Sequence, residues 1–132
     1  MNLAASQPSL AEARAKGMAG AEDISNTQLI QFMYACRSTF TNSEDAFYQH
    51  QEGLLNDAAF NSLVATVRFS FTSKGYRIAW KRSRDMYGRD FVEFMDKSLA
   101  EAPIKLPADR LAQWKVDLIA EGSREVVANN QG

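Results

Sequence analysis

The sequence predicts an all-α protein, a compact bundle of five to six helices with a flexible N-terminal arm. Apolar residues recur at steps of three and four along most of the chain, which is the spacing that keeps them on one helix face. No segment has the strict alternation of apolar and polar residues that is typical of a half-buried strand. With 132 residues, 45% of them hydrophobic, the chain has the size of one ordinary domain with a single core.

The flexible arm is predicted over residues 1–22, which are rich in Ala and Gly. The few large apolar residues of this segment are too widely spaced to build an apolar face, so little holds it to a core. A single helical domain is expected over residues 23–122, followed by a polar tail over residues 123–132.

The first long helix is predicted to begin at Ser25, which forms a capping-box pattern with Gln28. Gly53 suits the left-handed conformation that ends many helices. Thr and Asn residues near Asn42 favour caps over helix interiors, so a kink there is an open alternative to a continuous helix. The predicted apolar seam consists of Leu29, Met33, Cys36, Phe40, Ser43, Phe47, His50 and Leu54.

Three further helices are predicted before Pro103, which stops the last of them. The first is capped by Asn56 and ends at a turn over residues 73–75; the second runs from about Tyr76 to Met86, before Gly88. The third carries Phe91, Phe94, Met95 and Leu99 on one face. The residues predicted to form the core are Phe47, Leu54, Phe60, Val64, Trp80, Phe91 and Phe94.

A last helix is predicted to begin at Pro107, since the missing N–H of proline costs nothing in the first turn. Gly122 is predicted to end it. Its expected buried face consists of Leu111, Trp114, Leu118 and Ile119.

No pattern of residues predicts a catalytic or metal site. The lone Cys36 excludes an internal disulfide, and its place on the apolar seam predicts burial and a raised pKa. His50 has Ala46 and Leu54 four residues away on either side, where a helical metal site would need a carboxylate, so we expect a histidine hydrogen-bonded within the core. Phosphate-binding glycine loops and glycine-flanked serine nucleophiles are missing from the sequence. We therefore expect no enzyme and no cofactor, with a hydrolytic or metal-dependent enzyme around His50 as an alternative.

A basic stretch lies between residues 68 and 89, where only Asp85 opposes seven cations. Aromatic residues are interleaved with them, an arrangement in which bases stack on rings while Lys and Arg bind phosphates. The alternative is a solvated face with ion pairs, of which Lys81 with Asp85 is one. The candidate contacts to an anion or nucleic acid are Arg77, Lys81, Arg82, Arg84 and Arg89.

The sequence contains no apolar run near the roughly 20 residues that cross a bilayer. Its N-terminal segment alternates Ala with polar residues where a signal peptide would be continuously apolar. We expect a cytoplasmic protein, membrane-associated only if an upstream membrane segment is missing from this chain.

A more extended pattern runs through Glu44, Phe47, Tyr48, Gln49, His50, Gly53, Leu54, Leu55 and Asn56. It continues through Lys74, Gly75, Arg77, Trp80 and Arg82 to residues 90–96. In these residues the segment 42–96 resembles a broad group of uncharacterised bacterial helical domains. The resemblance implies a soluble helical domain of a kind that often follows membrane helices, with no established activity. The chain departs from the group in lacking a preceding membrane segment and in having Gly88-Arg89 where the group tends to have Ser-Pro at a helix start.

Taken together, these features predict a small, non-catalytic interaction or regulatory module that binds a protein partner or a second copy of itself. The alternative function is nucleic-acid or anionic-surface binding through the basic stretch.

Overall fold

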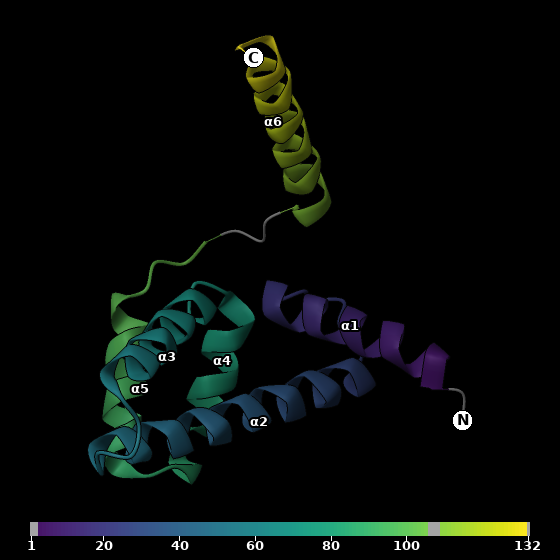
Figure 1. Cartoon of the computed structure of the whole chain (residues 1–132). Helices are drawn as coiled ribbons and strands as arrows, with labels where there is room; N and C mark the ends of the chain where they lie inside the picture. The colour runs from purple at the N-terminus through teal and green to yellow at the C-terminus, as the bar shows by residue number, and fades with distance from the viewer. Residues whose placement is uncertain (1–2, 106–108, 132) are drawn as a thin grey trace.

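The computed structural model describes residues 3–105 and 109–131, and this part of the chain is all-α, without strands (Figure 1). The elements are α1 (Leu3–Ala19), α2 (Asn26–Gln51), α3 (Asp57–Ser70), α4 (Lys74–Ser83), the 3-10 helix η1 (Arg84–Met86), α5 (Arg89–Glu101) and α6 (Arg110–Gln131). The predicted fold class is therefore confirmed. None of the described helices is long and apolar enough to cross a membrane.

Helix α2 is the element around which the bundle is organised, because it contacts α1, α3, α4 and α5. Figure 1 shows α1 beside the first half of α2, and α3, α4 and α5 grouped beside its second half. At 26 residues, α2 is about 39 Å long for a rise of 1.5 Å per residue. This length allows one helix to pack against α1 along its first half and against α3, α4 and α5 along its second half.

The predicted limits of α2 are confirmed. Ser25 Oγ accepts from Gln28 N at 3.1 Å, and Gln28 Oε1 accepts from Ser25 N at 3.0 Å, which completes the capping box. Gly53 has a φ of 75°, the left-handed conformation expected of it. The helix is continuous through Asn42, because the buried Phe40 and Ser43 on either side of it face the core.

Aromatic side chains make up most of the core. Phe40 packs edge-on against Trp80 with 5.2 Å between ring centroids, and both side chains are fully buried. The buried core residues are Phe32, Cys36, Phe40, Phe47, Val67, Phe71, Tyr76, Ala79, Trp80, Phe91 and Met95. Of the predicted core, Phe47, Trp80 and Phe91 are buried, and Phe60 and Phe94 pack against them from partly buried positions. Val64 is also partly buried.

The prediction that Leu54 belongs to the core is wrong, since its side chain is 74% exposed. Helix α2 ends at Gln51, and the left-handed Gly53 then turns the chain out of the helical path before Leu54 is reached. Leu29, at the other end of the predicted seam, is 44% exposed. Apolar residues at steps of three and four are buried only where the helix continues and other helices pack against it.

The second half of α1 is packed, so the bundle begins before residue 23, where the domain was predicted to start. Ala13 is fully buried, and a Cβ added to Gly17 would collide with the Phe32 ring. A Cβ added to Gly75 of α4 would collide with the carbonyl oxygen of Gly17, so α1 and α4 touch backbone to backbone. The first turns of α1 extend past the N-terminal end of α2 in Figure 1, and residues 9–12 are exposed. Any free arm is therefore shorter than residues 1–22.

The C-terminal region differs from the prediction in two ways. Gly122 lies inside α6, which continues to Gln131, so the expected polar tail is helical over residues 123–131. A single glycine in an exposed helix costs only about 1 kcal/mol relative to alanine, which the flanking turns can offset. The predicted buried face is exposed: Leu111, Trp114, Leu118 and Ile119 are exposed by 60%, 61%, 52% and 71%. No other described helix makes an extensive contact with α6, and Pro107 lies outside the described residues.

Candidate functional site

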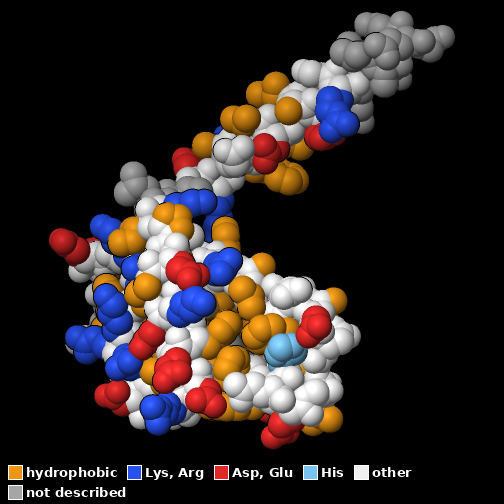
Figure 2. All heavy atoms as spheres, turned by 90° about the vertical axis from the view of Figure 1, so that its left-hand side faces the viewer, with side chains coloured by type: hydrophobic (Ala, Val, Ile, Leu, Met, Phe, Trp, Pro, Cys, Tyr) orange, Lys and Arg blue, Asp and Glu red, His pale blue; other side chains and the backbone are white. Residues whose placement is uncertain are grey.

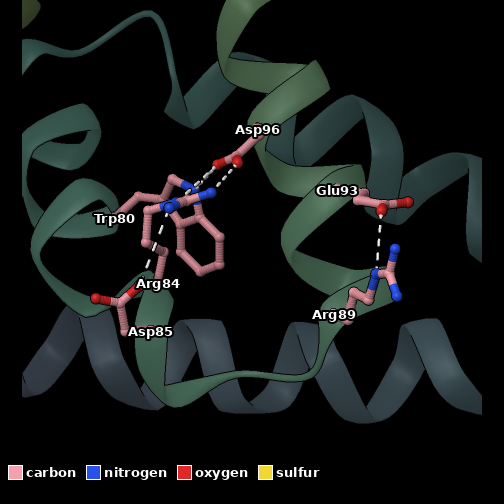
Figure 3. Close-up of polar contacts among 6 residues, drawn as sticks. All are labelled: Trp80, Arg84, Asp85, Arg89, Glu93 and Asp96. Carbon is pink, nitrogen blue, oxygen red and sulfur yellow. Dashed lines mark hydrogen bonds and ion pairs between the residues drawn. The ribbon is translucent and has the colours of Figure 1, made fainter.

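Three polar side chains meet where η1 faces α5 (Figure 3). Trp80 Nε1 donates to Asp96 Oδ1 at 2.9 Å, and Arg84 Nε donates to the same oxygen at 3.3 Å. Arg84 Nη2 also donates to Asp96 Oδ2. The hydrogen bond from Arg84, supported by that from Trp80, lowers the pKa of Asp96, whereas partial burial acts in the opposite direction. The cluster fastens α4 and η1 to α5.

Arg77 is turned toward the bundle. Its Nη1 lies 3.1 Å from the Phe71 carbonyl oxygen, 3.0 Å from that of Leu99 and 3.3 Å from that of Ala102. These oxygens belong to the C-terminal ends of α3 and α5, where carbonyl groups lack helical partners. Arg77 therefore joins two helix ends through Nη1, which donates to backbone carbonyl groups.

The other candidate cations lie in different surroundings. Arg89 pairs with Glu93 one turn along α5 at 3.6 Å, with side chains that are 90% and 68% exposed. Lys81 and Arg82 are exposed and have no ion pair among the described residues. The predicted pair of Lys81 with Asp85 is not formed; Asp85 instead lies 3.9 Å from Arg84.

The structure therefore does not bring the predicted contact residues together as one free basic face. Arg77 and Arg84 are engaged within the bundle, Arg89 is paired on the next helix, and only Lys81 and Arg82 stay unpaired within the described part of the chain. Figure 2 shows positive and negative side chains interspersed over the bundle face that it presents. Such mixing is typical of a solvated protein surface.

His50 lies on the edge of the core. Its ring stacks on Phe60 with 3.9 Å between centroids and an interplanar angle of 4°, and its Nε2 lies 2.9 Å from Asp57 Oδ1. The imidazole side chain is 27% exposed, and that of Asp57 is 92% exposed. Among the described residues no group of three potential ligands is suitable for a metal ion. The expected hydrogen bond is present, but its partner is an exposed side chain at the start of α3.

Cys36 is buried, as the seam predicts, with a side chain that is 4% exposed. Burial raises the pKa of its thiol to about 12, and the charge of Arg14 opposes this only in part. A thiol with such a pKa is a poor nucleophile at neutral pH. The residue is part of the core.

A groove between α1, α2 and α4 was not predicted. It has a volume of about 510 Å³, and its lining is mostly apolar. Sequence reasoning missed it because it treated residues 1–22 as an arm, whereas α1 supplies one wall. The lining residues are Lys16, Gly17, Gly20, Ala21, Ile24, Leu29, Phe32, Met33, Arg37, Gly75, Ile78, Ala79 and Arg82.

The apolar face of α6 is the second candidate binding surface. Leu111, Trp114 and Leu118 follow one another at steps of three and four, so they lie along one side of the helix. All three are more than half exposed, and Figure 2 shows hydrophobic side chains along this projecting helix. Helical periodicity did identify these residues, but it could not say whether this chain or another molecule covers them.

Comparison with known proteins adds no assignment: no family model matches the chain, and neither a curated protein nor a solved structure is significantly similar to it. The resemblance of residues 42–96 to a group of bacterial helical domains therefore stays a prediction.

Proposed function

We propose that this protein is a non-catalytic interaction module that self-associates through the apolar face of α6. The observation that carries the proposal is the exposure of Trp114, which is 61% exposed between Leu111 and Leu118 on the same helix side. Large apolar patches on a protein surface commonly mark places where another molecule binds. The opposite side of α6 carries Gln113, Asp117 and Arg124, so the helix is amphipathic and has one side suited to water.

A second copy of α6 is the partner that this helix face fits best. The spacing of Leu111, Trp114 and Leu118 is that of a short coiled-coil seam. Gly122 lies one turn beyond Leu118 on the same side, and apart from the neighbouring helix backbone no described atom lies within 4 Å of the position that a Cβ would take there. If two α6 helices cross antiparallel at Leu118, Trp114 and the partner copy's Gly122 lie at the same level, because each is four residues from Leu118.

This pairing gives the mid-helix glycine a physical purpose. An indole needs space in a helix interface, and a residue without a side chain provides it. Glycine inside a helix is otherwise unfavourable relative to alanine. The contact is also isologous, with the same patch on both copies, so it closes into a dimer and does not propagate.

The proposal is tested by light scattering of the full chain over a concentration series at low and high salt. We expect a dimer that persists at high salt, because apolar burial is not screened by ions. Leu118→Lys should give a monomer. Ala120→Lys is the matched control, since it places the same charge on the opposite side of α6 and should leave the dimer intact. A wild-type protein that is monomeric at all concentrations would exclude self-association.

A further inference from the structure

The groove between α1, α2 and α4 has an apolar floor that joins two helices. Met33 of α2 and Ile78 of α4 both line it, and Ile78 is 53% exposed. Phe32 and Ile24 extend the lining toward α1. The volume of about 510 Å³ falls within the range of roughly 300 to 1,000 Å³ that is usual for small-molecule sites.

The charged residues of the groove are arranged unevenly. Arg37 lies four residues after Met33, and Arg82 lies four residues after Ile78, so each guanidinium is one turn beyond a floor residue on the same helix side. Within the described part of the chain, the Arg37 guanidinium makes one weak hydrogen bond, from Nη2 to the Met86 sulfur at 3.6 Å.

Neither guanidinium has an ion-pair partner among the residues that the structure describes. On the α1 side of the groove, Lys16 is paired with Asp23 at 3.2 Å. The uncompensated positive charge of the groove is therefore carried by the two arginines, next to an apolar floor.

We propose that this groove binds a long-chain carboxylate, with the alkyl chain on the floor and the carboxylate between Arg37 and Arg82. Guanidinium groups bind carboxylates through paired, charge-assisted hydrogen bonds, which suits an anionic head at this position. The floor offers apolar contacts and few polar partners, so it suits an unbranched hydrocarbon chain. Charge complementarity at the arginines selects an acid over an alcohol or a cation of equal length.

The test is a calorimetric titration of the full chain with decanoate, 1-decanol and decyltrimethylammonium. We expect saturable 1:1 binding of decanoate, and at least tenfold weaker binding of the other two probes. Arg82→Ala and Arg37→Ala should each weaken decanoate binding about tenfold. Lys81→Ala is the matched control, because Lys81 is also an exposed, unpaired cation of α4 but does not line the groove, and it should bind as the wild type.

A second variant separates the apolar floor from the charges. Ile78→Asp changes an exposed side chain, so the fold should persist, and it places a carboxylate where the alkyl chain would lie. Circular dichroism and thermal unfolding check that each variant is folded. The proposal is overturned if decanoate does not bind, if the three probes bind equally, or if folded arginine variants bind as the wild type. None of the lining residues belongs to α6, so this result and the self-association result are independent.

Discussion

Trp80 and Asp96 join α4 to α5 through a single hydrogen bond of 2.9 Å between Nε1 and Oδ1. The Trp80 side chain is fully buried in the folded protein, and the Asp96 carboxylate is the acceptor that satisfies its N–H. Asp96 also accepts from Arg84, which lies closer to solvent. One carboxylate thus satisfies a buried donor and an exposed cation together, and substitutions at residue 96 can separate the two effects.

Asp96→Ala should lower the free energy of unfolding more than Asp96→Asn does. Alanine leaves the buried indole N–H without a partner, at a cost of about 1 to 3 kcal/mol. Asparagine keeps an acceptor for that N–H and loses the charge and one of the two acceptor oxygens opposite Arg84, a solvent-exposed pair of the kind that contributes little to stability. Urea unfolding of both variants measures the difference. Equal losses would mean that the indole hydrogen bond contributes nothing.

The stability of the protein should fall in acid through Asp96. Its pKa is lowered in the folded state, chiefly by the hydrogen bond from Arg84, so the unfolded chain takes up this proton first as the pH falls. The stabilisation is complete above the ordinary carboxyl pKa of about 3.9 and is lost as the pH falls through the lower folded value. Urea unfolding at several pH values should show the gap between wild type and Asp96→Asn closing below about pH 4. A gap that is independent of pH would contradict this.

Gly75→Ala and Gly122→Ala should change stability in opposite directions. A Cβ at Gly75 collides with backbone at Gly17, so α1 must move away from α4, and we expect a loss of more than about 1 kcal/mol. A Cβ at Gly122 meets no described neighbour in its own chain, so alanine should stabilise α6 by up to about 1 kcal/mol in the monomer, at protein concentrations too low for the proposed dimer. Thermal unfolding, monitored by circular dichroism, measures the change in stability of the two variants. Tolerance of alanine at residue 75 would show that the close crossing is not needed.

Trp80→Ala and Leu54→Ala contrast a confirmed core residue with a rejected one. Removal of the fully buried Trp80 side chain should cost about 3 to 5 kcal/mol, as large-to-small core changes do. Leu54 is 74% exposed, and its truncation should change the free energy of unfolding by no more than about 0.5 kcal/mol. Chemical denaturation of the two variants gives both values. An unchanged midpoint for Trp80→Ala would remove this residue from the core.

The basic stretch should not bind a mixed-sequence oligonucleotide at physiological salt. Only Lys81 and Arg82 of the five candidate residues are unpaired among the described residues, and two phosphate contacts provide little of the counterion release that drives such binding. Light scattering with and without the oligonucleotide, at low and high salt, makes the comparison. An increase in mass at low salt alone would favour the alternative function.

Local sequence signals predicted the fold correctly for helices that also pack into the core. The Ser25 and Gln28 pattern placed the start of α2, and the Asn56 side chain caps α3 at Ala59 N, at 2.8 Å. Periodicity failed at Leu54 because the helix had already ended, and on α6 because an apolar face in the sequence does not reveal which molecule covers it. The packed half of α1 was missed because Ala13 and Gly17 contribute by being small, which no hydrophobic pattern records.

The candidate binding sites were less predictable than the fold, for a related reason. A count of cations marked Arg77 as a contact residue, but its three carbonyl partners come from chain segments up to 25 residues away. Arg37 was not marked, because it lies outside the basic stretch and shares a groove with Arg82 only in the folded chain, where α2 and α4 line the same groove. Tertiary contacts decide which charges are available to a ligand.

Because Cys36 lies in the core, the reactivity of its thiol reports how often the folded protein opens. The chain has one thiol, and at mildly alkaline pH the folded structure keeps almost all of it protonated and shielded from reagents. A thiol reagent can therefore react at an appreciable rate only with molecules in which α1 or α2 has moved away from its neighbours. The rate of labelling relative to that of an unprotected thiol then gives the free energy of that opening, without an introduced residue or a denaturant.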